Sequence, residues 1–68
     1  MRRSNPEALA RAQDTVEQIR SAIAGLEAQL AKARERDDAK AAAEAEEAIA
    51  ARRSWLAEAE RTLAELSG

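Results

Sequence analysis

An apolar repeat runs through the first half of this chain, stops near Asp37, and resumes out of phase. Before the break, apolar residues recur at alternating steps of three and four, which places them in one stripe along a helix. These residues are Leu9, Ala12, Val16, Ile19, Ile23, Leu26, Leu30 and Ala33. The same spacing resumes with Ala42, Ala45, Ile49, Arg52, Leu56, Ala59, Leu63 and Leu66. An unbroken repeat would place Asp37, Lys40 and Glu44 at seam positions, which an apolar seam does not tolerate. The sequence therefore predicts two helices rather than one.

Folding the chain back at its centre sets the two stripes against each other in layers. The layers run from Ala33 with Ala42 near the turn to Leu9 with Leu66 at the open end. Flanking residues of opposite charge also meet in this arrangement: Arg34 with Glu46, Glu27 with Arg53, and Arg20 with Glu60. Each exposed pair contributes only about 0.2–1 kcal/mol, so their expected role is to disfavour slipped pairings. We expect an all-α antiparallel two-helix hairpin, a short coiled coil forming one domain over residues 1–68.

The predicted helices span residues 6–36 and 39–66, with a turn at residues 37–38. Asn5 is a candidate cap for the first helix and Pro6 suits its first position, and we expect residues 1–4 to be frayed. The turn lacks glycine, although a reversal commonly has one just past the first helix. Asp37 and Asp38 are both candidate caps there. Without a turn, the chain would form one helix of about 60 residues and about 90 Å.

Composition limits the core that such a hairpin can form. More than half of the hydrophobic residues are alanine. Residues 39–51 contain one large apolar residue, Ile49, so we expect the turn end to be thin and to open first. A chain of 68 residues with so few large apolar side chains buries little surface relative to the cost of ordering it. We therefore expect self-association into a helical bundle, or binding to a larger protein.

Two residues of the second helix are candidates for that interface because of their chemistry. Trp55 is the only aromatic residue, and it is either a lid on the seam or an interface anchor, since tryptophan is enriched at binding hot spots. Arg52 occupies a seam position. In one interpretation, the methylene stem of Arg52 lies on the seam and its guanidinium points to water or to Glu27. In the other, Arg52 sets the register of the two helices or contacts an acidic group on a partner.

Small residues supply the other candidates: Ala50, Ala57 and Gly25. Alanines recur every seven residues on the flank of the second helix away from Trp55, at Ala43, Ala50, Ala57 and Ala64. The high helix propensity of alanine explains its presence at any helix position, whereas close packing of helices in an oligomer explains the regular spacing. Gly25 costs about 1 kcal/mol relative to alanine in a helix. It is either a tolerated defect or part of a patch with Ser21, Ala24 and Ala28 over which another helix passes.

The residue types present exclude most common catalytic and metal sites. The chain has no cysteine, histidine or tyrosine, which removes the usual nucleophile–base pairs and transition-metal ligands. We therefore expect no enzyme, no cofactor, no metal and no small-molecule substrate. The net charge of −2 argues against binding to nucleic acid or to an anionic membrane. The sequence also shows no membrane span and no signal-peptide core, so we expect a cytoplasmic protein or one exported by an unusual route.

The turn resembles one known family. The stretch Ala33-Arg34-Glu35-Arg36-Asp37-Asp38-Ala39-Lys40, followed by Ala43-Glu44, is similar to the hairpin tip of Gre-type transcript-cleavage factors. That resemblance implies a hairpin that enters RNA polymerase, where two tip acids three residues apart help to hold a catalytic metal. Asp38 matches the first acid, but Ala41 stands at the second.

Other positions of the turn depart from that family too. Asp37 replaces its glycine, Ala42 and Ala45 replace its tip asparagine and tyrosine, and no stretch resembles its second domain. The resemblance therefore implies, as an alternative function, a transcription modulator that presents the Asp37-Asp38 tip to polymerase without cleavage activity.

Overall fold

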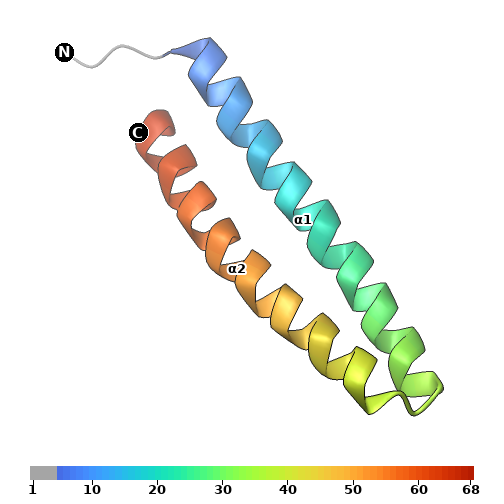
Figure 1. The fold of residues 1–68 in the computed structure, drawn as a ribbon. Helices are drawn as coiled ribbons and strands as arrows, with labels where there is room; N and C mark the ends of the chain where they lie inside the picture. The colour runs from blue at the N-terminus through green and yellow to red at the C-terminus, as the bar shows by residue number, and fades with distance from the viewer. Residues whose placement is uncertain (1–4) are drawn as a thin grey trace.

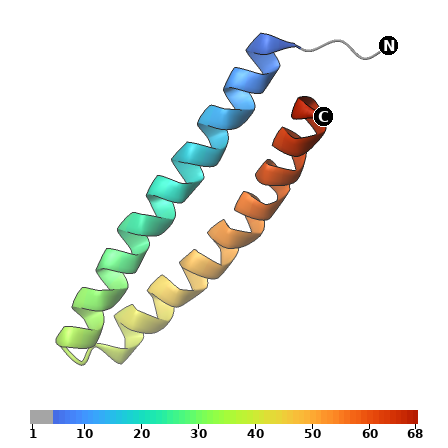
Figure 2. The same cartoon turned by 180° about the vertical axis from the view of Figure 1, so that it is seen from behind.

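The computed structural model describes residues 5–68, so the expectation for residues 1–4 lies outside the described part. Two helices, α1 (Pro6–Glu35) and α2 (Ala39–Ser67), make up the fold. They run antiparallel and lie side by side along their length (Figures 1 and 2). The rod they form has principal extents of 56 × 14 × 11 Å. The predicted hairpin is confirmed, and the alternative of one helix of about 90 Å is wrong.

The start of α1 follows the predicted capping pattern. Asn5 has an extended backbone, and its side-chain Oδ1 accepts a hydrogen bond from the Ala8 N–H at 3.1 Å. Pro6 occupies the first helical position, where no amide donor is needed. Glu7 lies in the first turn, where a carboxylate interacts favourably with the positive end of the helix dipole. These local interactions explain why α1 begins at Pro6.

Two backbone hydrogen bonds close the turn after α1. The Asp38 N–H donates to the Ala33 carbonyl oxygen at 2.8 Å, and the Asp37 N–H donates to the Arg34 carbonyl oxygen at 3.1 Å. This pair of bonds is the Schellman motif, which places a left-handed residue just past the helix. Asp37 fills that position with φ 54°. Asp37 is therefore the reversing residue of the turn and takes the place that glycine commonly holds.

Asp38 performs the capping role that was predicted for both acids. Its side-chain Oδ1 accepts from the Ala41 N–H at 3.0 Å, and its carbonyl oxygen accepts from the Ala42 N–H at 3.0 Å. The side-chain bond satisfies an amide of the first turn that has no backbone partner, and the carbonyl bond is the first backbone hydrogen bond of α2. The turn between the helices thus needs only three residues, Arg36 to Asp38.

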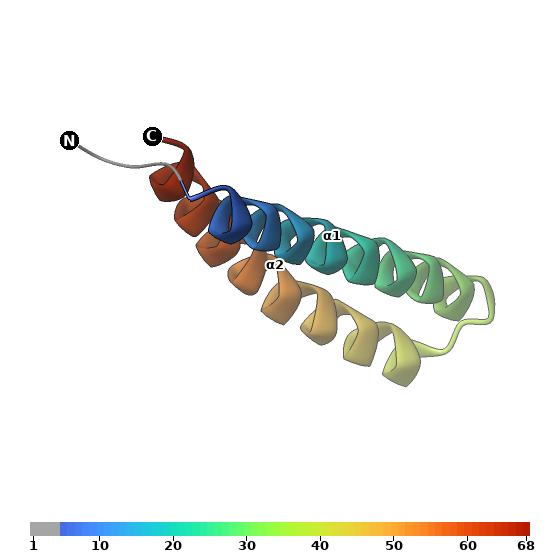
Figure 3. The same ribbon diagram turned by 90° about the horizontal axis from the view of Figure 1, so that it is seen from above.

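The seam between the helices consists of the predicted residues. All of them are buried or half-buried, and the five most covered are Val16, Ile23, Ala33, Ala45 and Ile49. Within residues 5–68, only Ala8, Ala41 and Ala48 are half-buried from outside the predicted set. Figure 3 shows the two helices from above, running alongside each other. The out-of-phase repeats therefore identified the packed surface correctly.

Burial varies along the seam. Ala33 and Ala45, near the turn, are 2% and 7% exposed, whereas Leu9, Leu63 and Leu66 at the open end are only half-buried. The turn end is therefore covered at least as well as the open end. That the turn end is thin and opens first stays a prediction.

The outer surface of the rod is mostly exposed polar residues and alanine. Neither helix, over the residues that the structure describes, has an apolar stretch long enough to cross a membrane. Because the seam residues are covered, the side chains available to bind a partner lie on the two flanks of the seam, on the outer surfaces of the helices, and at the turn.

Candidate interaction surfaces

One flank of the seam carries all three predicted ion pairs, and we call it the ion-pair face. The Nη2–Oε2 distances are 2.7 Å for Arg20 with Glu60, 2.9 Å for Arg34 with Glu46, and 3.1 Å for Arg53 with Glu27. These side chains are about half exposed or more, so each pair contributes only about 0.2–1 kcal/mol. The predicted pairs are confirmed, and they link the two helices along much of the rod.

The regular alanine stripe of α2 borders the ion-pair face. Ala50 and Ala57 each precede a charged residue of that face, Arg53 and Glu60, by three positions, so they lie next to it on the helix surface. Both alanines are exposed. The hairpin itself therefore gives them no packing role.

The opposite flank of the seam is the Trp55 face. The ion-pair residues of α2 each follow a seam residue by one position, whereas Trp55 precedes the seam residue Leu56 by one. Because a helix advances 100° per residue, these positions fall on opposite sides of the seam. Steps of seven residues from Trp55 give the rest of this face on α2, namely Ala41, Ala48 and Thr62. The corresponding residues of α1 are Ala8, Thr15, Ala22 and Gln29.

Trp55 and Arg52 form a pair on this flank that was not predicted. The Arg52 Cζ lies 5.0 Å from the centroid of the Trp55 ring, a cation–π contact between residues three apart on one helix. Trp55 remains 55% exposed, so a large part of its indole is open to solvent, and both the lid and the interface anchor stay hypotheses. Arg52 is half-buried, as predicted for its stem, but its head goes to Trp55 while Glu27 pairs with Arg53. The spacing of three residues was the sequence signal for this contact.

Gly25 lies on the exposed outer side of α1. A Cβ atom added there would meet no heavy atom within 4 Å. Ser21, Ala24 and Ala28, the other members of the predicted patch, are exposed as well. The hairpin therefore does not require glycine at this position, and both the tolerated defect and the contact patch remain hypotheses.

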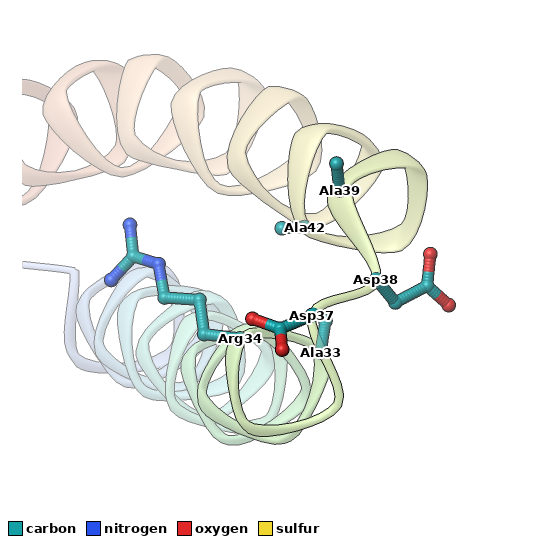
Figure 4. A pocket seen from close by; sticks show the side chains of 6 residues that line it. All are labelled: Ala33, Arg34, Asp37, Asp38, Ala39 and Ala42. Carbon is teal, nitrogen blue, oxygen red and sulfur yellow. The ribbon is translucent and has the colours of Figure 1, made fainter.

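A shallow pocket of about 250 Å³ lies at the turn. It is lined by Ala33, Arg34, Asp37, Asp38, Ala39 and Ala42 (Figure 4). The Arg34 guanidinium extends along the rod to Glu46. The two acids point in different directions in Figure 4, and the Asp38 carboxylate lies at the start of α2, where it accepts from the Ala41 N–H. Across residues 5–68, no three acidic side chains are grouped in a way that would hold a metal ion.

Comparisons of this chain with protein-family models, with curated proteins and with solved structures find no match. The functional argument therefore rests on the geometry of the hairpin. Its most unusual surface feature is the exposed indole of Trp55 beneath the Arg52 guanidinium.

Proposed function

We propose that this chain is a small non-enzymatic interaction or assembly module, whose hairpin presents one face to a second copy or to a larger protein. The exposed indole of Trp55 carries the proposal. Trp55 is the one large hydrophobic residue with an exposed side chain among residues 5–68. An exposed tryptophan on a rigid helix is a favourable anchor, because it buries a large area on binding and loses little conformational freedom.

The small core of the hairpin supports the same proposal. Only five hydrophobic residues of the described chain are buried, and two of them are alanine. No side chain among residues 5–68 is fully buried. Ordering a chain costs about 1–2 kcal/mol per residue in backbone entropy. A partner that covers the half-buried leucines would add burial that two helices alone lack.

The charge and residue types favour a protein as the partner. With a net charge of −2, the hairpin offers no strong attraction to nucleic acid or to an anionic membrane. The absence of cysteine, histidine and tyrosine from the sequence favours a module without catalytic residues, cofactor, metal or small-molecule substrate. We place this module in the cytoplasm.

A capture experiment with matched variants tests the proposal. The tagged chain is expressed in its source cell, and retained proteins are compared for the wild type, Trp55→Ala and Ser54→Ala. Ser54 is exposed and adjacent in sequence to Trp55, so Ser54→Ala is the control. We expect the wild type and the control to retain a protein partner or further copies of the chain, and Trp55→Ala to lose it.

Two other results would count against the proposal. Retention of RNA polymerase subunits that Asp38→Asn abolishes and Trp55→Ala leaves unchanged would favour the transcription modulator. A chain that retains no protein and sediments as a monomer at all concentrations would contradict an interaction module altogether.

A further inference from the structure

We propose that two copies of the hairpin pair through their Trp55 faces, with a two-fold axis parallel to the long axis of the rod. In this arrangement α1 of each copy lies against α2 of the other, and the four helices form an antiparallel bundle. The inference rests on the proposed function and specifies the partner as a second copy of this chain.

The Trp55 face is suited to burial because it has no charged residue of its own. From Ala8 to Gln29 on α1 and from Ala41 to Thr62 on α2, its positions hold alanine, threonine, glutamine and tryptophan. Small residues allow helix axes to approach to about 8–10 Å. The ion-pair face, in contrast, carries six charged residues, and burying them would require their desolvation. The Trp55 face is therefore the flank on which a second hairpin packs at lower cost.

The two edges of the Trp55 face carry opposite charge. The edge on α1 is formed by Arg11, Gln18, Gly25 and Lys32, and the edge on α2 by Glu44, Ala51, Glu58 and Glu65. All eight residues are exposed. In the part of the chain that the structure describes, Lys32 and Glu44 make no ion pair within the hairpin. The α1 edge is thus basic and the α2 edge acidic.

This charge pattern selects the direction of the two-fold axis. Rotation about an axis parallel to the helices keeps every residue at its own height along the rod. It places the α1 edge of one copy beside the α2 edge of the other, so that Lys32 meets the partner's Glu44. Gly25 then meets the partner's Ala51, where two small residues allow close approach. An axis perpendicular to the helices would instead set the basic edges together and the acidic edges together, with like charges opposed.

The same rotation provides a site for Trp55. The seam layer of Leu56 with Ile19 fixes the height of Trp55 along α1. In the pair, the indole therefore lies over the partner's α1 between its Thr15 and Ala22. Both residues are exposed and small, and they leave room for a ring that buries about 150–250 Å² when fully covered. Each dimer contains two such contacts.

Arg52 limits the strength of this pairing. Its guanidinium lies over Trp55 and is the charge that reaches this face from the seam. The two Arg52 side chains of a dimer lie at the same height on either side of the axis, so they repel each other. Arg52→Leu should therefore tighten the dimer. An acidic partner on this face would instead bind the Arg52→Leu variant more weakly, because it would lose an attractive charge.

Charge reversal with analytical ultracentrifugation provides the first test. We expect the wild type to be a dimer at micromolar concentration. Lys32→Glu and Glu44→Lys should each raise the dimer dissociation constant about tenfold, because two symmetry-related contacts become repulsive. The double variant should restore dimerisation, since both contacts are attractive again. Glu47→Lys makes the same charge change on the exposed outer side of α2 and should leave the dissociation constant unchanged.

Disulfide trapping provides an independent test, because the chain has no native cysteine. An equimolar mixture of Gly25→Cys and Ala51→Cys should form a disulfide between unlike chains under mild oxidation. Each variant alone should remain uncrosslinked, since identical positions lie on opposite edges of the pair. The control mixture of Ala24→Cys with Ala50→Cys, on the other side of the hairpin, should not crosslink.

The outcomes separate this inference from the proposed function. The inference would be overturned if both charge reversals left the dimer dissociation constant unchanged and Ala50→Glu or Ala57→Glu raised it. The copies would then pair through the alanine stripe. A monomer that still captures a different protein through Trp55 would also overturn it. In both cases the proposed interaction module would stand, whereas a monomer that captures nothing would overturn both.

Discussion

The Asp38 N–H donates to the carbonyl oxygen of Ala33 at 2.8 Å, and this bond closes the reversal between the helices. It forms because the intervening Asp37 adopts a left-handed backbone with φ 54°. Left-handed conformations are unfavourable for most L-residues, and aspartate is among the few that adopt them at modest cost. A residue that adopts the left-handed conformation at lower free-energy cost should therefore stabilise the turn.

Asp37→Gly should stabilise the hairpin by about 0.5–1 kcal/mol, because glycine adopts positive φ without steric cost. Asp37→Val should destabilise it by about 1–2 kcal/mol, because a β-branched side chain is strained in this conformation. Urea unfolding followed by circular dichroism measures both changes. A glycine variant less stable than the wild type would show that the carboxylate of Asp37 matters more than its backbone angle.

Asp38→Ala should destabilise the hairpin by about 1 kcal/mol, because it removes the side-chain acceptor for the Ala41 N–H. Asp38→Asn keeps a side-chain oxygen at the cap and should retain most of the stability. Thermal unfolding of the two variants separates capping from charge. Equal losses in both would mean that the negative charge, and not the hydrogen bond, is what stabilises this end of α2.

Gly25→Ala should stabilise the monomeric hairpin by about 1 kcal/mol, because glycine is a poor helix former and the added methyl group meets no neighbouring atom within 4 Å. The melting temperature should be measured at low protein concentration, where self-association does not contribute to it. A decrease in monomer stability would show that the added methyl group meets a neighbour within the hairpin itself, contrary to the open space at this position.

Ile49→Ala should cost about 2–4 kcal/mol, because Ile49 is only 6% exposed and its removal leaves a cavity in the seam. Leu56→Ala should cost roughly half as much, about 1–2 kcal/mol, because Leu56 is half-buried and solvent can fill part of the space. Chemical unfolding of the two variants provides the comparison. A greater loss for Leu56→Ala would place the stabilising contacts nearer the open end than burial indicates.

Much of this fold could be predicted from the sequence because two independent patterns agree. The phase break between Ala33 and Ala42 located the turn, and the matching charges of Arg20 with Glu60 fixed the pairing of the helices. Each pattern depends only on helix geometry and on which residue types tolerate burial, so neither requires knowledge of detailed packing. The seam and the ion-pair face followed directly.

The remaining features depend on local conformation that spacing does not determine. Nothing in the sequence distinguished the left-handed Asp37 from the capping Asp38, since aspartate suits both roles. The guanidinium of Arg52 lies over Trp55 while Glu27 pairs with Arg53, and the position of Arg52 in the seam did not by itself indicate this direction. The burial of Ala33 and Ala45 near the turn did not follow from counting large apolar residues, because an alanine side chain is small enough to be covered by few neighbours.

The start of α1 and the end of α2 lie together at one end of the rod, with the turn at the other (Figure 1). A fluorophore or affinity tag attached next to the start of α1 or the end of α2 would consequently be separated from the turn by most of the 56 Å length. An attachment to the termini therefore leaves the acidic turn accessible, and an immobilised hairpin would extend that turn outward from the support.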